Sequence, residues 1–278
     1  MISVKKILLR TRRFLNTAER AWNNDEMEMQ NRLGEPVRLE RFGYKVFSQN
    51  DEDGIIEEIF NRIGVTDKRF VEFGVENGLE SNGHFLLHKG WSGLWIEGSK
   101  KHCKTIQKLF RKPIEQKRLT AVNAFITAES INGIIAGWKG DAGGGIDLLS
   151  IDIDGNDYHI WNAIKCISPR VVIVEYNSKF PPTYEWVMPY NADYVRNYGI
   201  LKGGSDCFGA SLKSFEILGG KLGYQLVGTN LNGVNAFFVK KELAQNLFAL
   251  PASAENMYNP PRHNIAYGSR HASSAYIG

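Results

Sequence analysis

The amino-acid sequence predicts an α/β fold in which helices cover both faces of a mostly parallel, doubly wound β-sheet. Short apolar stretches alternate with helix-like stretches of roughly ten residues, which is the pattern of successive βαβ units. The last two strand-like stretches flank Asn232-Gly233, a strong hairpin signal, so the sheet is expected to end in antiparallel strands. The composition, with 43% hydrophobic and 23% charged residues, is that of a globular protein with a substantial core.

The helices are predicted from the spacing of apolar residues and from the residues that typically start or end a helix. Acidic residues at 51–53 precede Ile55, Ile59 and Ile63, a spacing that predicts a helix from about 51 to 63, and Gly64 ends it. Further helices are expected at 81–89, 100–110, 129–138, 158–167 and 208–220.

Strands are expected where β-prone apolar residues cluster, at 70–73, 93–97, 119–125, 146–153, 170–176, 224–229 and 234–240. The chain then divides into three parts. Residues 1–45 are predicted to form a basic, helix-prone N-terminal extension, 46–250 the sheet domain, and 251–278 a loose C-terminal tail rich in Pro, Ser and Asn.

The charge is concentrated near the start of the chain. Residues 1–20 contain six Lys or Arg and one Glu, so the net charge of +4 leaves about −1 for residues 21–278. A nucleic-acid partner is not expected, because such proteins show a basic face on the folded domain itself. Weak contact of residues 1–20 with an anionic membrane surface is one expectation, and a surface helix with solvated charges is the alternative. The oligomeric state is not predicted.

The cysteines and the apolar runs favour a cytoplasmic protein. Cys103, Cys166 and Cys207 are an odd number, lie far apart and form no C-x-x-C pair, which argues against a disulfide framework or a zinc ribbon. No apolar run approaches the ~18 residues that span a bilayer.

A glycine turn follows the first predicted strand and points to a cofactor. Gly74 and Gly78 stand before a helix, and Glu97 ends the next strand, 97 − 74 = 23 residues after Gly74. Glycines allow close approach to a ligand, and a carboxylate about 20 residues on can bind ribose hydroxyls. This pattern indicates an adenosine-containing cofactor, either NAD or S-adenosylmethionine. Glu76 would repel a pyrophosphate and tolerate a sulfonium, which disfavours NAD.

Several spans resemble the FkbM-type class I methyltransferases, which use S-adenosyl-L-methionine. They are FVEFGVENGLESN, GWSGLWIEGS, DLLSIDIDGNDYHIWNAI, VVIVEYN and FGASLKSFEILGGKLGYQLVGTNLNGVNAFFV, and the resemblance covers about residues 46–242. It implies a Rossmann-like, seven-stranded, mostly parallel sheet with a C-terminal antiparallel hairpin. The chain departs from the family at Glu76, where such turns often have a smaller residue.

The resemblance also implies where the cofactor lies. Glu72, Gly74 and Gly78 would border its methionine part, Glu97 would hold the ribose, and Asn123 with Ala124 would lie beside the adenine. The residues expected around the cofactor are Glu72, Gly74, Val75, Gly78, Asn82, Glu97, Asn123, Ala124 and Asp152.

Acidic residues gather at the ends of the fourth and fifth predicted strands. Asp154, Glu175 and Asn177 are oxygen donors that would suit Mg²⁺, and a turn capped by aspartates is the alternative. A hydroxyl acceptor needs a general base or a metal, and Asp154 and His159 are the candidate catalytic bases. His159 has the alternative of a helix-surface histidine.

An aromatic segment follows the fifth strand. Residues 176–200 hold seven aromatic residues, and 176–207 is expected to be an irregular lid, which either binds the acceptor or packs onto the sheet.

The sequence therefore predicts an S-adenosylmethionine-dependent methyltransferase, with Mg²⁺ as a further candidate cofactor. Its acceptor is expected to be a hydroxyl on a saccharide or a small metabolite. The alternatives are an NAD-dependent oxidoreductase on the same kind of sheet and a non-catalytic, cofactor-binding scaffold.

Overall fold

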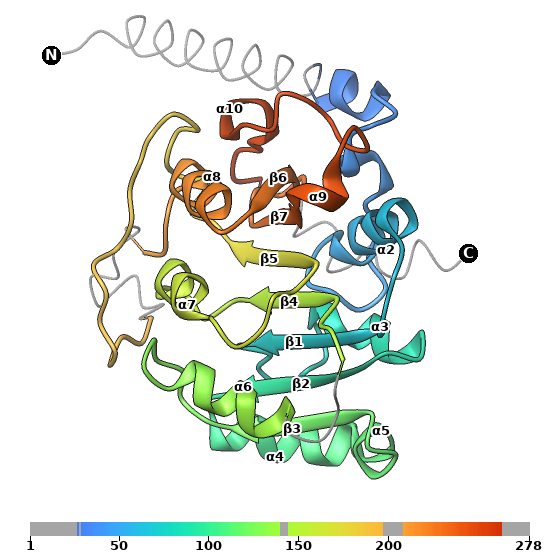
Figure 1. The fold of residues 1–278 in the computed structure, drawn as a ribbon, viewed down its shortest axis with the longest axis vertical. Coiled ribbons are helices and arrows are strands. Elements are labelled where there is room, and N and C mark those ends of the chain that lie inside the picture. The colour runs from blue at the N-terminus through green and yellow to red at the C-terminus, as the bar shows by residue number, and fades with distance from the viewer. Residues whose placement is uncertain (1–26, 28, 140–143, 197–207, 263–278) are drawn as a thin grey trace, which may run out of the picture.

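The computed structural model describes residues 27, 29–139, 144–196 and 208–262 and contains one seven-stranded sheet. The strands are β1 (Arg69–Phe73), β2 (Ser92–Glu97), β3 (Leu119–Asn123), β4 (Leu148–Ile151), β5 (Val171–Glu175), β6 (Tyr224–Thr229) and β7 (Asn235–Lys240). Their order is β3-β2-β1-β4-β5-β7-β6, from bottom to top in Figure 1. Strands β1 to β5 pair in parallel, and β7 pairs antiparallel with both β5 and β6. The predicted mostly parallel sheet with a C-terminal antiparallel hairpin is confirmed.

Helices cover both faces of this sheet. Besides a helical stretch at 29–34, the helices are η1 (Leu39–Phe42), α2 (Glu52–Ile63), α3 (Asn82–His88), α4 (Lys100–Leu109), α5 (Arg111–Glu115), α6 (Ile131–Lys139), α7 (Asp157–Ala163), α8 (Leu212–Lys221), α9 (Lys241–Ala244) and α10 (Ala254–Met257). The six helices expected from the sequence all form, with ends shifted by a few residues. The short η1, α5, α9 and α10 were not expected, because single turns leave no periodic signal.

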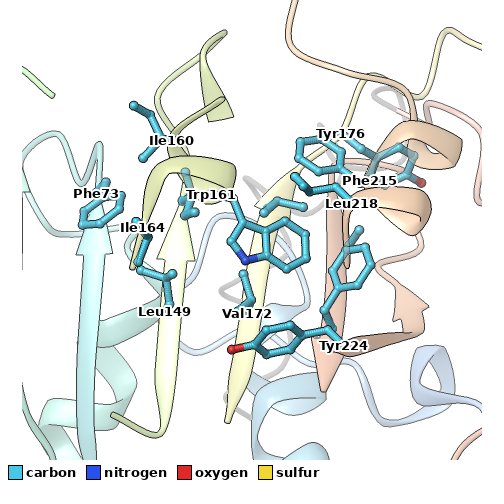
Figure 2. Close-up of a cluster of buried hydrophobic side chains, with 14 of the residues drawn as sticks. Phe73, Leu149, Ile160, Trp161, Ile164, Val172, Tyr176, Phe215, Leu218 and Tyr224 are labelled. Atoms are coloured by element: carbon cyan, nitrogen blue, oxygen red, sulfur yellow. The ribbon is translucent and has the colours of Figure 1, made fainter. Parts of the chain in front are cut away.

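Two apolar cores lie on the two sides of the sheet, because successive strand residues point to opposite faces. In β4, Leu149 belongs to the core beneath α6, α7 and α8, and Leu148 to the core beneath α2, α3 and α4. Figure 2 shows Trp161 of α7 within the first core, beside Val172 and Phe215. The sheet is therefore buried on both faces, as its run of Val and Ile in β5 predicts.

The order of the strands places a crevice beside β1. Strands β2 and β3 continue the sheet on one side of β1, and β4 and β5 continue it on the other. Ligands bind to such sheets outside the carboxyl ends of the strands where the order reverses. In Figure 1 the arrowheads of β1, β4 and β5 mark this edge at the left.

The sheet domain extends beyond the expected limits of 46 and 250. Leu39 is fully buried against α2, and Arg38 donates two hydrogen bonds to Asn256. The expected loose tail is packed at 251–262, where Met257 and Asn259 are each 1% exposed. Polar residues hold this segment through buried hydrogen bonds, which composition alone does not reveal.

Some expectations fall on residues outside those that the structure describes. These are the basic segment 1–26 with its membrane contact, residues 197–207 of the lid with Tyr198 and Cys207, and the tail from 263. Cys103 and Cys166 are free cysteines. No helix in the described part of the chain is long and apolar enough to cross a membrane.

Candidate functional site

The turn after β1 has two positions that favour glycine. Gly74 has φ +69°, and a Cβ there would overlap the carbonyl oxygen of Asp152 on the neighbouring strand end. Gly78 has φ +80°, and a Cβ there would press on the rings of Trp95 and Phe110. The turn therefore lies close to the end of β4 at Gly74 and close to two aromatic rings at Gly78, and neither position has room for a side chain.

Glu97 joins this turn to the end of β2. Its Oε2 accepts a hydrogen bond from the amide of Glu76 at 2.9 Å, and its Oε1 accepts one from Ser99 at 2.7 Å. Each carboxylate oxygen keeps a second lone pair for a further donor. Glu76 has φ +49° and an exposed side chain, so its backbone contributes to the site.

Residues at the end of β3 lie beside Glu97. Asn123 pairs with Glu97 in the β2–β3 register and donates hydrogen bonds from Nδ2 to the carbonyl oxygens of Glu97 and Gly98. The Ala124 amide donates to the same Glu97 carbonyl. Phe125, which the sequence analysis did not single out, is 51% exposed and lies next to Gly98. Its position directly after Asn123-Ala124 was the sequence signal that could have identified it.

Glu72 has a supporting role in the structure. Its buried carboxylate accepts hydrogen bonds from the amides of Asn82 (2.7 Å) and Gly83 (2.8 Å) and from the Trp95 indole (2.8 Å). Burial raises the pKa of Glu72 to about 7. Asn82 also donates from its side chain to Ser150 at 3.0 Å. These contacts fix the start of α3.

Val75, the remaining expected residue of the turn, is 6% exposed. Its carbonyl oxygen accepts a hydrogen bond from the Gly78 amide at 2.8 Å. Val75, like Glu72 and Asn82, therefore stabilises the turn. Direct contact of these residues with a cofactor stays a prediction.

Three carboxylates meet at the ends of β4 and β5. Oxygen atoms of Asp152, Asp154 and Glu175 all lie within 4.8 Å of one another. Arg196 places Nη1 2.7 Å from Asp154 Oδ1 and 3.5 Å from Glu175 Oε1. Burial, followed by repulsion among the carboxylates, raises the pKa of Glu175 to about 8 and raises the pKa of Asp152 well above its usual range. No sequence pattern marked Arg196, which is 42 residues from Asp154.

The predicted Mg²⁺ set is only partly brought together. Asp154 and Glu175 converge as expected, and Asp152 joins them. Asn177 donates from Nδ2 to Phe208 and accepts at Oδ1 from the Lys179 amide, both at 3.1 Å, so its side chain is engaged within the protein. Three oxygen donors fit a hard cation, although here the Arg196 guanidinium provides the positive charge.

Asp157 and His159 stabilise the turn and the lid. The Asp157 carboxylate accepts hydrogen bonds from the amides of Ile153 and Gly155, so this aspartate holds the turn that precedes α7. Burial raises its pKa to about 6. His159 Nε2 lies 2.7 Å from the carbonyl oxygen of Met188, a contact between α7 and the lid. Its role as a base stays a prediction.

The aromatic residues of the lid pack largely within the protein. Phe180 stacks on Tyr184 and Trp186, with ring centroids 5.8 and 4.7 Å apart. The Tyr190 hydroxyl donates to Glu129 at 2.6 Å. These contacts favour the packing alternative for the described part of the lid. A pocket nevertheless opens at the end of β5, lined in part by Glu175, Lys179, Arg196, Phe208 and Val234.

Comparison with known proteins finds distant likeness in fold. No protein-family model and no curated protein matches the chain. One similar solved structure is TrmK of M. capricolum in complex with S-adenosylhomocysteine, with 11% identity, 78% of this chain and 83% of that chain covered, and a TM-score of 0.43. The N-terminal domain of EvdMO1 with bound S-adenosylhomocysteine is 11% identical. The match covers 77% of this chain and 94% of that chain, with a TM-score of 0.42.

The methyltransferase domain of bacterial CtHen1-C is 15% identical. The match covers 68% of this chain and 96% of that chain, with a TM-score of 0.41. At these scores the likeness supports no assignment of substrate or activity. The description of the fold therefore rests on the strand order and pairing of the chain itself.

Proposed function

We propose that the chain is an S-adenosylmethionine-dependent methyltransferase. The observation that carries this proposal is the hydrogen bond between the Glu76 amide and the Glu97 carboxylate. It joins a glycine turn at the end of β1 to an acidic residue at the end of β2, beside the point where the strand order reverses. A ribose hydroxyl can donate to the lone pairs that Glu97 retains.

The neighbouring residues suit the rest of an adenosyl group. Asn123 and Ala124 line the side of Glu97 that would face an adenine, and the exposed Phe125 offers a ring for stacking. At the other end, the backbone of Asp152 contacts Gly74 and its side chain belongs to the carboxylate group. A bound sulfonium cation would favour the charged form of these carboxyl groups, whereas a pyrophosphate would be repelled by that form, which supports a methyl donor over NAD.

The proposed acceptor is a hydroxyl of a saccharide or a small metabolite. The pocket at the end of β5 opens beside the carboxylates, with Lys179 and Phe208 among its lining residues. In the proposed reaction the hydroxyl oxygen attacks the methyl carbon, the bond from carbon to sulfur breaks, and the hydroxyl proton passes to Asp154. His159 is the second candidate base. Holding both reactants in line in a water-poor site would provide much of the acceleration.

Mg²⁺ is a further proposal for the same edge. Asp152, Asp154 and Glu175 would hold it if Arg196 withdrew, and a bound Mg²⁺ would lower the pKa of a coordinated hydroxyl. The test is therefore made with and without Mg²⁺.

The first experiment is calorimetric titration of the purified full chain with S-adenosylmethionine, S-adenosylhomocysteine and NAD. Micromolar binding of the two adenosyl ligands, without binding of NAD, is the expected result. Glu97→Ala should weaken this binding by about 1–3 kcal/mol, whereas the matched exposed variant Glu242→Ala should bind normally. Binding of NAD alone would favour an oxidoreductase. Adenosyl binding without turnover on a panel of glycans and metabolites would favour the scaffold.

A further inference from the structure

The segment 100–118, which contains helices α4 and α5, carries a dense excess of positive charge. Residues 100–118 contain eight Lys or Arg and one Glu, a net charge of +7. Residues 1–20 add +5, so the remainder of the chain carries 4 − 7 − 5 = −8. The average of about −1 over residues 21–278 therefore concealed a strongly basic segment, and the sequence-based argument that the domain has no basic face is corrected here.

These charges form one exposed surface, which we call the basic edge. It consists of Lys100, Lys101, Lys104, Lys108, Arg111, Lys112 and Lys117, all exposed. The side chains of Cys103, Ile106 and Phe110 on the opposite side of the same segment are buried against the sheet. Figure 1 shows α4 and α5 at the bottom of the molecule, next to the edge strand β3.

The basic edge is poorly neutralised within the protein. Among the described residues, Arg111 has a carboxylate partner, Glu115 at 3.6 Å, and no ion pair within 4.0 Å is found for the six lysines. Lys100, Lys104 and Lys108 are spaced four residues apart, so they stand about 6 Å from one another along one row of α4. Like charges held this closely repel each other, and an external anionic surface would relieve that repulsion.

We propose that the basic edge docks the protein on an anionic phospholipid membrane. Each Lys or Arg near such a surface contributes about 1 kcal/mol of attraction, and the basic edge presents seven. Leu109, 50% exposed between Lys108 and Arg111, offers an apolar side chain at the same place. This inference does not depend on the proposed reaction.

The charge distribution favours a membrane over a nucleic acid. A planar membrane surface can touch the basic edge alone and leave the rest of the chain, with its net charge of −8, in water. A long polyanion that wraps the domain would be repelled by that negative charge. Six of the seven exposed cations are lysines, point charges without the planar fork of arginine. Phe110, which lies between α4 and α5, is 6% exposed and so offers no ring for base stacking.

The test is co-sedimentation of the full chain with vesicles. Vesicles of one third phosphatidylglycerol and two thirds phosphatidylcholine are compared with pure phosphatidylcholine at about 0.1 M salt. We expect the protein to bind at least tenfold more strongly to the anionic vesicles. Lys104→Gln/Lys108→Gln/Lys112→Gln, which keeps good helix formers, should weaken that binding by about 10- to 100-fold.

The matched control removes the same number of charges elsewhere. Lys165→Gln/Lys221→Gln/Lys241→Gln changes three exposed lysines outside the basic edge and should weaken binding less than threefold. Circular dichroism checks that every variant is folded. The proposal is overturned if the chain ignores anionic vesicles, if both triple variants weaken binding equally, or if an RNA duplex binds through the basic edge more tightly than the vesicles do.

Discussion

Gly74 shows at the scale of one residue how the fold determines the site. Its left-handed conformation and its contact with the Asp152 carbonyl oxygen bring the ends of β1 and β4 together. Gly74→Ala adds a methyl group where a backbone atom already lies, so we expect adenosyl binding to fall at least tenfold and the free energy of unfolding to drop by about 1–3 kcal/mol. Calorimetry and urea denaturation measure the two effects.

Gly137→Ala is the matched control for that substitution. Gly137 lies in α6 with nothing within 4 Å of an added Cβ. Alanine is the better helix former, so this variant should gain about 0.5–1 kcal/mol and bind normally. Equal behaviour of the two variants would contradict the argument for Gly74.

Asp154 is the residue whose catalytic role is most directly testable. If it accepts the hydroxyl proton, Asp154→Asn should lower the rate of methyl transfer by about 10²–10⁴-fold. Affinity for S-adenosylhomocysteine should stay within a factor of three, because Asp154 has no proposed contact with the adenosyl group. Asp193→Asn, an exposed aspartate in the same lid region, serves as the control. Full activity of Asp154→Asn would remove it from the mechanism.

The residues of the site differ in how far sequence could identify them. The places of Gly74 and Glu97 were predictable because local chain order fixes both a turn after a strand and a carboxylate at the end of the next strand, while their contact with a cofactor stays a prediction. Arg196 was not predictable, since its contact with Asp154 spans 42 residues and depends on the path of the lid. The hydrogen bonds that hold Glu72 inside the protein likewise come from tertiary packing.

At the scale of elements, alternation of strands and helices sufficed to predict the sheet but not the ends of the domain. The segment 251–262 lacks an apolar period, so it was expected to be loose. Three arginines hold it instead: Arg32 and Arg38 from one side and Arg262 from within. Hydrogen bonds from charged groups to backbone carbonyls and to amide side chains leave little trace in a sequence.

Arg38→Ala tests how firmly this C-terminal segment is held. Arg38 donates to the carbonyl oxygen and to the side chain of Asn256, and it lies 3.8 Å from the buried Glu40. Its loss should lower the free energy of unfolding by about 1.5–3 kcal/mol and speed amide exchange at 253–262. The exposed Arg41, changed to Ala, should have less than a third of this effect. Similar effects of the two variants would show that the segment is held by other contacts.

At the scale of the whole molecule, acidic groups are buried while basic groups are exposed along α4 and α5. Burial raises the pKa values of Glu72 and Asp51 to about 7 and raises those of Glu40 and Asp53. A carboxyl group with a raised pKa keeps its proton in the folded state at a pH where the unfolded chain has released it. The folded state then binds more protons, so the free energy of unfolding falls as the pH rises from about 4 to 8.

Asp51→Asn isolates one of these groups. Asp51 Oδ2 accepts a long hydrogen bond from the Leu231 amide, its Oδ1 is buried without a hydrogen-bond partner among the described residues, and Glu52 and Glu40 raise its pKa further. Asparagine keeps the acceptor for Leu231 and carries no charge. We therefore expect urea denaturation to show a stabilisation by this variant that is about 2 kcal/mol larger at pH 8 than at pH 5, because the folded-state pKa of about 7 lies between the two. Asp193→Asn should change neither value, and a loss of stability for Asp51→Asn at pH 8 would show that the Asp51 charge is compensated in the fold.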